Sequence, residues 1–463
     1  MNTLRPLLLI LLAGVILRLG LWAVFRDRPL FIYDEKYLYN ALATSILKDG
    51  EFALTRGEPT TNRPPLYPLF LAGVYHFSGL DNFQAVRLAQ AGISLLTVLL
   101  LYLTGTEIDG RRTGLLLSGL YCFYPSMLIY NNLLLTEVLF TFLLCASIYS
   151  LALLHKGGKI WVAVISGTLL ALAALTRSVL WLLPMVLCPC LAFTLSAPFR
   201  KRLLLISALL AAFIITLTPW AIRSTRLEKT LTIIDTSSGR NFMMGNYRHT
   251  PLYRAWDAIT LEGERSWHHE LVLAHPELPQ TTQGQRDRLA MYGGITFALH
   301  NPGLTLERDF IKFFNFWQLE RELLAGAGRG YFGSLSLPLL GALAIAIVGS
   351  YVAIMITGIF GIIMAAPSRA YHWLLLCIIV FVCAMHSISF GHSRYHLPLI
   401  PFIAFYAARA IVSWRAILRR RGQWSIRFAT VICCILAAYW VVEIAVLDYQ
   451  RWSGLVLGPI TAG

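Results

Sequence analysis

The chain has 463 residues, of which 57% are hydrophobic and only 14% are charged, and its formal net charge is +15. Its mean hydropathy of +0.63 excludes an ordinary soluble enzyme of this size, because such a protein needs far more charged surface. The composition therefore predicts a polytopic membrane protein.

Eleven apolar runs are long enough to cross a hydrocarbon core of roughly 30 Å. They fall near 5–24, 84–104, 113–131, 134–154, 160–176, 178–196, 203–221, 335–364, 371–390, 397–412 and 426–447. The first run has no small-residue cleavage site and is interpreted as an uncleaved anchor. A further stretch, 64–80, is apolar but short and broken by prolines, which favours an interfacial or re-entrant segment.

The distribution of charge predicts the orientation of these spans. The short connections on the N-terminal side hold 13 Lys or Arg and two acids, whereas the long segments 25–63 and 222–334 hold 6 basic with 6 acidic and 13 basic with 12 acidic residues. The positive-inside rule therefore puts the N-terminus and short loops in the cytoplasm and both long segments outside. The positive charge is thus a topology signal, and the pattern typical of nucleic-acid binding is absent.

We expect three parts: an N-terminal transmembrane module, 1–221, with a first external loop at 25–80; an external loop domain, 222–334, with helical stretches at 282–300 and 303–323; and C-terminal helices, 335–463. All eight cysteines fall inside predicted spans, where they behave as small apolar side chains. The sequence contains neither a phosphate-binding G-x-x-x-x-G-K-[ST] loop nor a dinucleotide-binding strand–glycine–helix unit, so nucleotide-driven chemistry is unsupported.

The first external loop contains two adjacent acids, Asp34 and Glu35, in FIYDEKYLYNALATSILKDG. Apolar residues from Leu38 onward recur at helical spacing, and Gly50 supplies a stop, so a short amphipathic helix is predicted. Asp34 has two interpretations. It is either the N-cap of this helix, without a capping box because Tyr37 occupies the third position, or a general base at the membrane surface.

Other ionisable residues gather at the external ends of the spans. An acid about one turn inside a span is a functional hypothesis by default, and this applies to Glu137. For two of the arginines, Arg177 and Arg226, snorkelling is the favoured explanation. Together, however, the cations suit a lipid-bound phosphate. The set consists of Arg177, Arg223, Arg226 and Arg394, the last flanked by His392 and His396.

Several segments in the same order resemble the bacterial branch of the dolichyl-phosphate-mannose-protein mannosyltransferase superfamily, which includes the aminoarabinose transferase of lipid A. They are YDEKYLYNALATSIL, NRPPLYPLFLAGVYHFSGLDNFQAVRLAQ, LYCFYPSMLIYNNLLLTEVLF, LTPWAIRSTR with SSGRNFMMGN, and FGHSRYHLPLIPF, from about residue 30 to 410. The resemblance implies an all-α polytopic membrane protein with the GT-C fold. It would have about eleven transmembrane helices, external juxtamembrane helices and a small α-rich external loop domain.

The resemblance also implies an activity: an inverting hexosyl- or pentosyltransferase of the bacterial inner membrane with a periplasmic active site. Its partners would be a polyprenyl-phosphate-sugar donor, a lipid, glycan or protein acceptor and membrane lipids, with no nucleic acid. By family position Asp34 is the base and Glu35 its partner. Arg394, Arg63, Arg223 and Tyr395 are expected to bind the donor phosphate, and Glu137, His392 and Tyr37 to line the acceptor side or cavity.

A divalent metal is possible, because some relatives hold one, but its candidate ligands here are scattered and no metal site is assigned. They are Glu137, His268, His269, Glu270 and His275. The main alternative is a lipid-linked-sugar flippase or other secondary transporter. A protein of that class should have charged residues in the middle of its spans, and the spans of this chain contain almost none there. A non-catalytic scaffold subunit is a third interpretation, against which the presence of Asp34 argues mildly.

Overall fold

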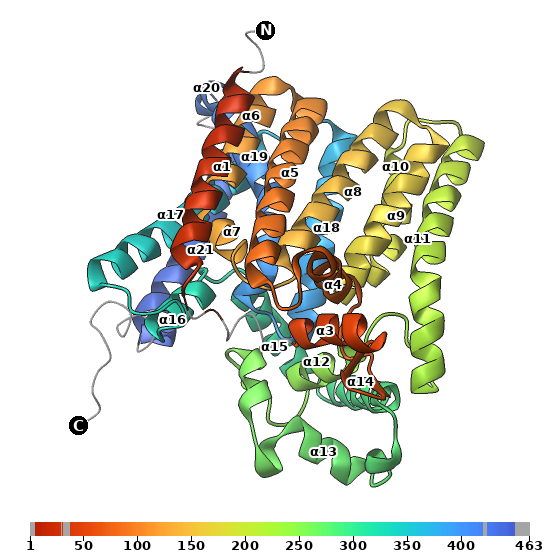
Figure 1. The fold of residues 1–463 in the computed structure, drawn as a ribbon. Coiled ribbons are helices and arrows are strands. Elements are labelled where there is room, and N and C mark those ends of the chain that lie inside the picture. The colour runs from red at the N-terminus through yellow and green to blue at the C-terminus, as the bar shows by residue number, and fades with distance from the viewer. Residues whose placement is uncertain (1–4, 29, 31–37, 420–423, 450–463) are drawn as a thin grey trace.

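The computed structural model describes residues 5–28, 30, 38–419 and 424–449, so the predicted site residues Asp34, Glu35 and Tyr37 lie outside the described residues. Long helices stand side by side, and a layer of shorter helices covers one end of them, the lower end in Figure 1. We call this end, which carries residues 38–78 and 229–334, the loop end.

Within the described ranges, eight helices are long and apolar enough to cross a membrane, and two apolar helices are shorter. The long ones are α1 (Arg5–Phe25), α5 (Phe83–Asp109), α8 (Glu137–Gly157), α11 (Phe199–Glu228), α17 (Leu337–Met364), α18 (Arg369–Ser389), η5 (Ser393–Leu399) joined to α19 (Ile400–Val412), and α21 (Trp424–Val442) continued by η6 (Glu443–Leu447). The shorter ones are α9 (Ile160–Thr176) and α10 (Pro184–Thr194).

Two predicted spans are wrong as continuous helices. The run 113–131 is divided into α6 (Arg111–Cys122) and α7 (Pro125–Tyr130), and the run 178–196 into η1 (Ser178–Leu182) and α10. Tyr124 has an extended backbone before Pro125. A residue that precedes proline avoids the helical region, because the proline ring clashes with its backbone. The break therefore follows from the local sequence.

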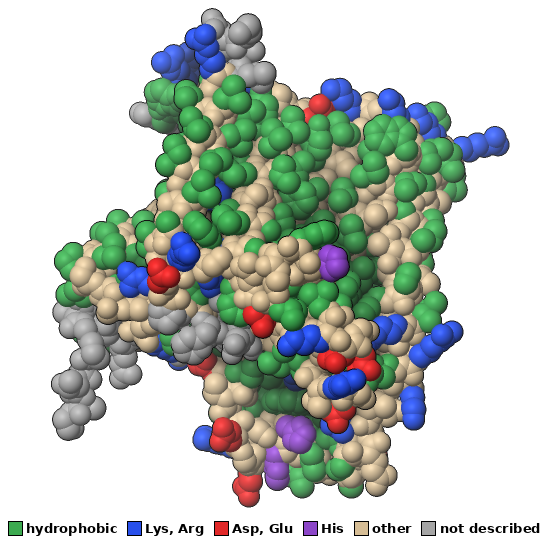
Figure 2. All heavy atoms as spheres, viewed as in Figure 1, with side chains coloured by type: hydrophobic (Ala, Val, Ile, Leu, Met, Phe, Trp, Pro, Cys, Tyr) green, Lys and Arg blue, Asp and Glu red, His purple; other side chains and the backbone are tan. Residues whose placement is uncertain are grey.

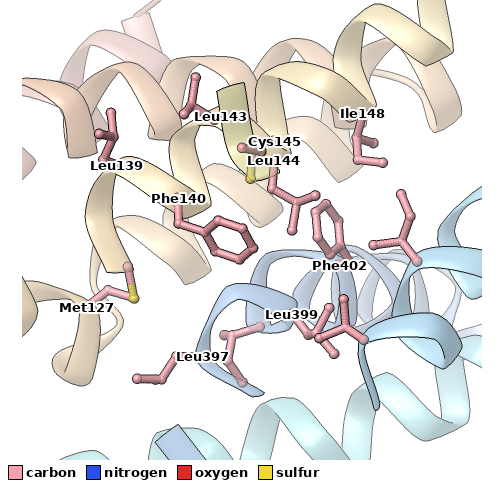
Figure 3. Packing of buried hydrophobic residues seen from close by; sticks show 14 of the residues in the cluster. Met127, Leu139, Phe140, Leu143, Leu144, Cys145, Ile148, Leu397, Leu399 and Phe402 are labelled. Carbon is pink, nitrogen blue, oxygen red and sulfur yellow. The ribbon is translucent and has the colours of Figure 1, made fainter. Parts of the chain in front are cut away.

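Burial separates central from peripheral helices. In α8 and in η5–α19, 78% of the most apolar window is buried, against 17% in α1 and 22% in each of α17 and α21. Figure 3 shows side chains of α7 and α8, such as Met127 and Phe140, packed beside Leu397 and Phe402 of η5–α19. The outer helices expose apolar side chains as a broad band between two charged ends (Figure 2), as expected for a surface in contact with lipid.

Small residues allow the closest helix contacts. A Cβ atom on Gly361 of α17 would lie 2.0 Å from the carbonyl oxygen of Tyr406 on α19, and one on Gly167 of α9 equally close to that of Leu209 on α11. Helices in lipid associate through such packing, since lipid tails are as apolar as the side chains. Glycine is therefore required where these backbones touch.

The loop end is built of short elements. The first loop contains α3 (Tyr39–Asp49), the hairpin β1 (Ala53–Thr55) and β2 (Glu58–Pro59), and α4 (Leu66–Ser78). The long loop contains α12 (Ser238–Gly245), η2 (Ala255–Thr260), η3 (Gly263–Arg265), α13 (Trp267–Ala274), η4 (Leu278–Gln280), α14 (Gln283–His300), α15 (Pro302–Phe316) and α16 (Glu322–Gly328). The short helix α20 (Trp414–Leu418) lies at the opposite end (Figure 1).

The predicted surface helix is present but starts later than expected. Helix α3 begins at Tyr39 after Leu38, whose φ of 60° is left-handed, and ends at Gly50, the predicted stop, with φ 70°. The residue that precedes α3 is Leu38, and Asp34 lies outside the described residues, so both interpretations of Asp34 stay predictions. The predicted stretch 303–323 is also interrupted, because α15 ends at Phe316 and α16 begins at Glu322.

One charge does lie inside a span. Arg18 of α1 is only 2% exposed, and it donates to Ser94 Oγ from Nε at 3.2 Å and from Nη2 at 2.9 Å. Its Nη1 reaches the carbonyl oxygens of Gly14 and Cys122. Ser94 belongs to α5 and Cys122 to α6, so these hydrogen bonds hold α1 against both helices. Arg18 is therefore an exception to the expectation that the spans are nearly free of charged residues.

Candidate active site

A buried carboxylate, Glu137, stands at the centre of the predicted site residues. It is the first residue of α8, and its side chain is fully buried. Arg394 Nε donates to Glu137 Oε1 at 2.5 Å, and Arg177 Nη2 donates to the same oxygen at 3.2 Å. Oε2 accepts no hydrogen bond from a described residue. One carboxylate therefore fixes two guanidinium groups at the loop end.

Three segments that are distant in sequence supply this cluster. Arg177 follows the last residue of α9 and has an extended backbone, so it no longer belongs to the helix. Arg394 lies in the 3₁₀ helix η5, where its backbone N–H donates to His392 Nδ1 at 3.0 Å. Glu137 gains from the partial positive charge at the start of α8. The local sequence sets each backbone, and only the packing brings the side chains together.

Aromatic rings surround both arginines. Arg177 lies over Tyr395 and Phe140, with 5.4 and 5.5 Å from its guanidinium carbon to the ring centroids, and Arg394 lies 5.9 Å from that of Tyr130. The side chain of Arg177 is only 15% exposed. Snorkelling is therefore the wrong explanation for Arg177, whereas Arg226 is exposed as that explanation requires.

Arg63 joins this group through Tyr39. Its guanidinium carbon is 5.9 Å from the Tyr39 ring centroid. Burial raises the pKa of the Tyr39 phenol, and the positive charges of Arg63, Arg177 and Arg394 oppose that rise. All three arginines thus lie close enough to act on one side chain. The structure brings together Arg63, Arg394 and Glu137, which the sequence had selected separately.

Arg223 has different contacts. Its guanidinium donates to the carbonyl oxygens of Thr60 at 3.2 Å and Phe52 at 3.3 Å, and it stacks on Trp220 at 4.5 Å from the ring centroid. These contacts fasten the β1–β2 hairpin to α11. They give no support to the predicted phosphate-binding role of Arg223.

His392 and Tyr395 border the cluster. The His392 ring lies 4.5 Å from that of Trp256, and its Nε2 is 4.0 Å from a Glu322 carboxylate oxygen. Tyr395 stacks on His386, with the ring centroids 4.4 Å apart. Of the metal candidates, His275 pairs with Glu277 on the surface. Among the described residues, no three His, Cys, Asp or Glu side chains gather to hold a metal ion.

Sequence reasoning missed two groups, Asp235 just before α12 and Arg240 within it. Asp235 accepts a hydrogen bond from Ser178 Oγ at 2.9 Å, and Ser178 directly follows Arg177. Burial lowers the pKa of Arg240, and the charge of Arg63 lowers it further. Arg240 lies in the stretch SSGRNFMMGN, which contributes to the family resemblance, and this is the signal that could have identified it. Residue type alone did not distinguish Asp235 from the other acids of the loop.

Asp235 predicts a pH dependence. Burial raises its pKa from 3.8 to about 6, so between these values the folded protein binds a proton that the unfolded chain lacks. The free energy of unfolding should therefore fall as the pH rises through this window, by about 2–3 kcal/mol at about 1.4 kcal/mol per pKa unit. Thermal unfolding in detergent at pH 4.5 and 7 should show Asp235→Asn more stable than the wild type at pH 7 only. An equal response of both proteins to pH would contradict this assignment.

A second buried carboxylate, Glu320, occupies the break between α15 and α16. It accepts hydrogen bonds from the hydroxyl groups of Tyr124 and Ser126, and His396 Nε2 lies 3.3 Å from its Oε1. Glu320 and Arg394 both line a cavity of about 10 Å³, which has room for one water molecule. The sequence predicts a continuous helix over 303–323, which assigns no role to Glu320.

The sequence and the fold were compared with those of known proteins. A family model described as dolichyl-phosphate-mannose-protein mannosyltransferase matches residues 62–222. A search of curated protein sequences gives no match. The structure is similar to the oligosaccharyltransferase AglB from Archaeoglobus fulgidus, in complex with an inhibitory peptide and a dolichol-phosphate, with a TM-score of 0.51 and 14% identity over 96% of this chain and 56% of that one.

It is also similar to ArnT from Cupriavidus metallidurans bound to undecaprenyl phosphate, with a TM-score of 0.51 and 14% identity over 98% of this chain and 74% of that one. The chain spans just over half the length of the archaeal protein. At this identity the likeness establishes the fold. With the matched segment 62–222, it confirms the expected fold class: the chain is an all-α, multi-pass membrane protein with the GT-C fold.

Proposed function

We propose that this protein is an inverting glycosyltransferase that moves a hexosyl or pentosyl group from a polyprenyl-phosphate carrier to a lipid, glycan or protein acceptor. The observation that carries the proposal is the pair of guanidinium groups, Arg177 and Arg394, fixed on the buried Glu137 within a GT-C fold. Solved structures with this fold contain dolichol-phosphate and undecaprenyl phosphate. Fixed arginines suit a phosphate because guanidinium groups match its charge and geometry.

In the proposed reaction, the acceptor hydroxyl oxygen attacks the anomeric carbon from the side opposite the phosphate. The bond between that carbon and the phosphate oxygen breaks, its electron pair leaves with the lipid phosphate, and the configuration inverts. Asp34 takes the hydroxyl proton, with Glu35 beside it in the sequence. A phosphate leaves as an anion, so it needs positive charge more than a general acid. Arg394, Arg177 and Arg63 would supply this charge.

The proposed location is the bacterial inner membrane, with the loop end outside the cytoplasm. The short connections at the opposite end carry most of the unbalanced Lys and Arg residues, which the positive-inside rule keeps in the cytoplasm. Lysines and arginines are visible at that end in Figure 2, whereas acids and bases are mixed at the loop end. A carrier lipid would then meet the arginines at the external membrane surface.

The test uses purified protein in liposomes with undecaprenyl phosphate sugars and an envelope lipid extract as acceptor, without nucleotide. We expect sugar to leave the carrier and undecaprenyl phosphate to accumulate. Arg394→Gln should weaken binding of undecaprenyl phosphate by about 10- to 100-fold, the value of a charged hydrogen bond. Arg223→Gln is the matched control, and it should lower thermal stability without changing binding.

Two outcomes would overturn the proposal. The first is movement of the intact lipid-linked sugar across the bilayer without transfer, which is the result expected of a flippase. The second is equal loss of undecaprenyl phosphate binding in Arg223→Gln and Arg394→Gln, because it would show that the cluster around Glu137 has no special part in binding.

A further inference from the structure

A wide groove lies on the outer surface at the end opposite the loop end. Its volume is about 960 Å³, and it is lined by the first two turns of α9 and α11 and by the turn between α8 and α9. Ile160 and Trp161 of α9 are 48% and 57% exposed, and Leu204 of α11 is 50% exposed. Such side chains form the apolar band that contacts lipid (Figure 2). The groove therefore opens toward the membrane.

The apolar wall of the groove runs along the helix axis. Val164 and Ile165 follow Ile160 and Trp161 at a spacing of four residues, so these four side chains form one stripe on α9. Leu204 adds an apolar side chain from α11. A stripe along the axis of a membrane-spanning helix extends from the membrane surface into the hydrocarbon core. It therefore has the direction of lipid acyl chains.

Two lysines stand at the outer end of this stripe. Lys159 immediately precedes α9, and its ammonium nitrogen lies 5.9 Å from the centroid of the Trp161 ring. Lys201 is the third residue of α11, and its ammonium nitrogen would lie 3.2 Å from a Cβ atom on Gly158. Lys201 thus covers the α8–α9 turn, in which Lys159 is the next residue. Both lysines line the groove, so its mouth carries two positive charges.

The protein supplies little negative charge at this mouth. Neither Lys159 nor Lys201 has a carboxylate partner among the described residues. Lys156, three residues earlier, differs because it pairs with Glu107 at 2.9 Å. The start of a helix carries partial positive charge, and neither α9 nor α11 has an acid in its first turn to offset it. An anion at the mouth of the groove would therefore be favoured by both lysines.

We propose that this groove binds one anionic phospholipid of the membrane, with its phosphate on Lys159 and Lys201 and its acyl chains along the apolar stripe. Basic pockets between spans are typical sites for anionic lipid headgroups, and tryptophan is typical of the headgroup level. The volume lies at the upper end of the roughly 300–1,000 Å³ of small-molecule sites, which suits two acyl chains better than one prenyl chain. The inference does not depend on the proposed transferase activity.

The test adds lipid to the purified protein in detergent and counts bound molecules by native mass spectrometry. Phosphatidylglycerol is the anionic probe, and phosphatidylcholine, which has no net charge, is its comparison. In the wild type, one phosphatidylglycerol should bind more tightly than any further copies and more tightly than phosphatidylcholine. It should also raise the unfolding temperature, because a ligand that binds only the folded state stabilises that state.

Replacing both lysines tests the headgroup contact. Lys159→Gln combined with Lys201→Gln should weaken the first phosphatidylglycerol site about 25-fold, from about fivefold for each basic residue near anionic lipid. Both side chains are exposed, so the variant should fold. Arg200→Gln is the matched control, because Arg200 is exposed and adjacent to Lys201 but does not line the groove. Arg200→Gln and the charge-preserving Lys159→Arg should both bind like the wild type.

Three results would overturn the proposal. Equal binding of phosphatidylglycerol and phosphatidylcholine would show that the groove does not select charge. An equal loss in Arg200→Gln and in the double variant would show that the affinity comes from the general positive charge of this surface. A double variant that loses undecaprenyl phosphate but keeps phosphatidylglycerol would assign the groove to the carrier lipid. None of these results measures sugar transfer, so the proposed function is tested separately.

Discussion

Asp34→Asn should reduce sugar transfer by about 100- to 10,000-fold, the usual contribution of a general base, while binding of undecaprenyl phosphate stays unchanged. Asparagine has nearly the same shape as aspartate but cannot take the acceptor proton. The measurement is turnover of an undecaprenyl phosphate sugar in liposomes, with binding measured separately on the same preparation. Asparagine caps a helix about as well as aspartate, so loss of a helix cap would not explain the expected defect.

A matched control is Asp49→Asn in the same loop. Asp49 ends α3, and one of its carboxylate oxygens lies 3.5 Å from Arg56, whose side chain is 85% exposed. Exposed pairs contribute about 0–1 kcal/mol, so this change should leave both turnover and folding intact. Glu35→Gln should have a smaller effect than Asp34→Asn. Full turnover in Asp34→Asn would remove Asp34 from the mechanism.

Glu137→Gln is expected to have the second large effect, on stability and binding together. It leaves Arg177 and Arg394 beside a neutral amide in a buried site, and breaking a buried ion pair in this way costs about 3–5 kcal/mol. The two guanidinium groups lose their common anchor, so undecaprenyl phosphate binding should also weaken. Thermal unfolding in detergent and lipid binding in nanodiscs measure the two effects.

The control for this change is Glu107→Gln. Glu107 pairs with Lys156 at the opposite end of the bundle, and the side chain of Lys156 is 65% exposed. That substitution should cost about 0–1 kcal/mol and leave lipid binding unchanged. If Glu137→Gln were as stable as Glu107→Gln, the buried cluster would not be the structural centre of the site.

Much of the site was within reach of the sequence. Ionisable residues at the ends of apolar spans are few, so Glu137 and Arg394 stood out by type and position, and the family resemblance added Arg63. The structure brings these three together. Arg223 met the same criteria but binds backbone carbonyl groups of the hairpin. The sequence around Arg223 does not indicate these partners, because the hairpin lies more than 150 positions earlier in the chain.

The functional residues that sequence reasoning missed have partners on distant segments, and the local apolar pattern around them predicts the wrong structure. Apolar periodicity across 303–323 predicts one helix, yet the chain breaks after Phe316 and turns Glu320 inward toward Tyr124, Ser126 and His396. Those partners come from α6–α7 and η5, so no window of sequence contains them. Arg18 was missed for a similar reason, because the hydroxyl group that accepts its hydrogen bonds, that of Ser94, belongs to another helix.

The sequence by itself determined the membrane class, the approximate positions of the spans, and the all-α GT-C fold. These depend on hydrophobic length, charge asymmetry and the order of local motifs, which are properties of contiguous residues. Only the tertiary structure decided which charges meet: Arg177 and Arg394 on Glu137, and Glu320 with His396. In a low-dielectric interior a charge persists only where a partner satisfies it, and that partner is chosen by helix packing across the whole chain.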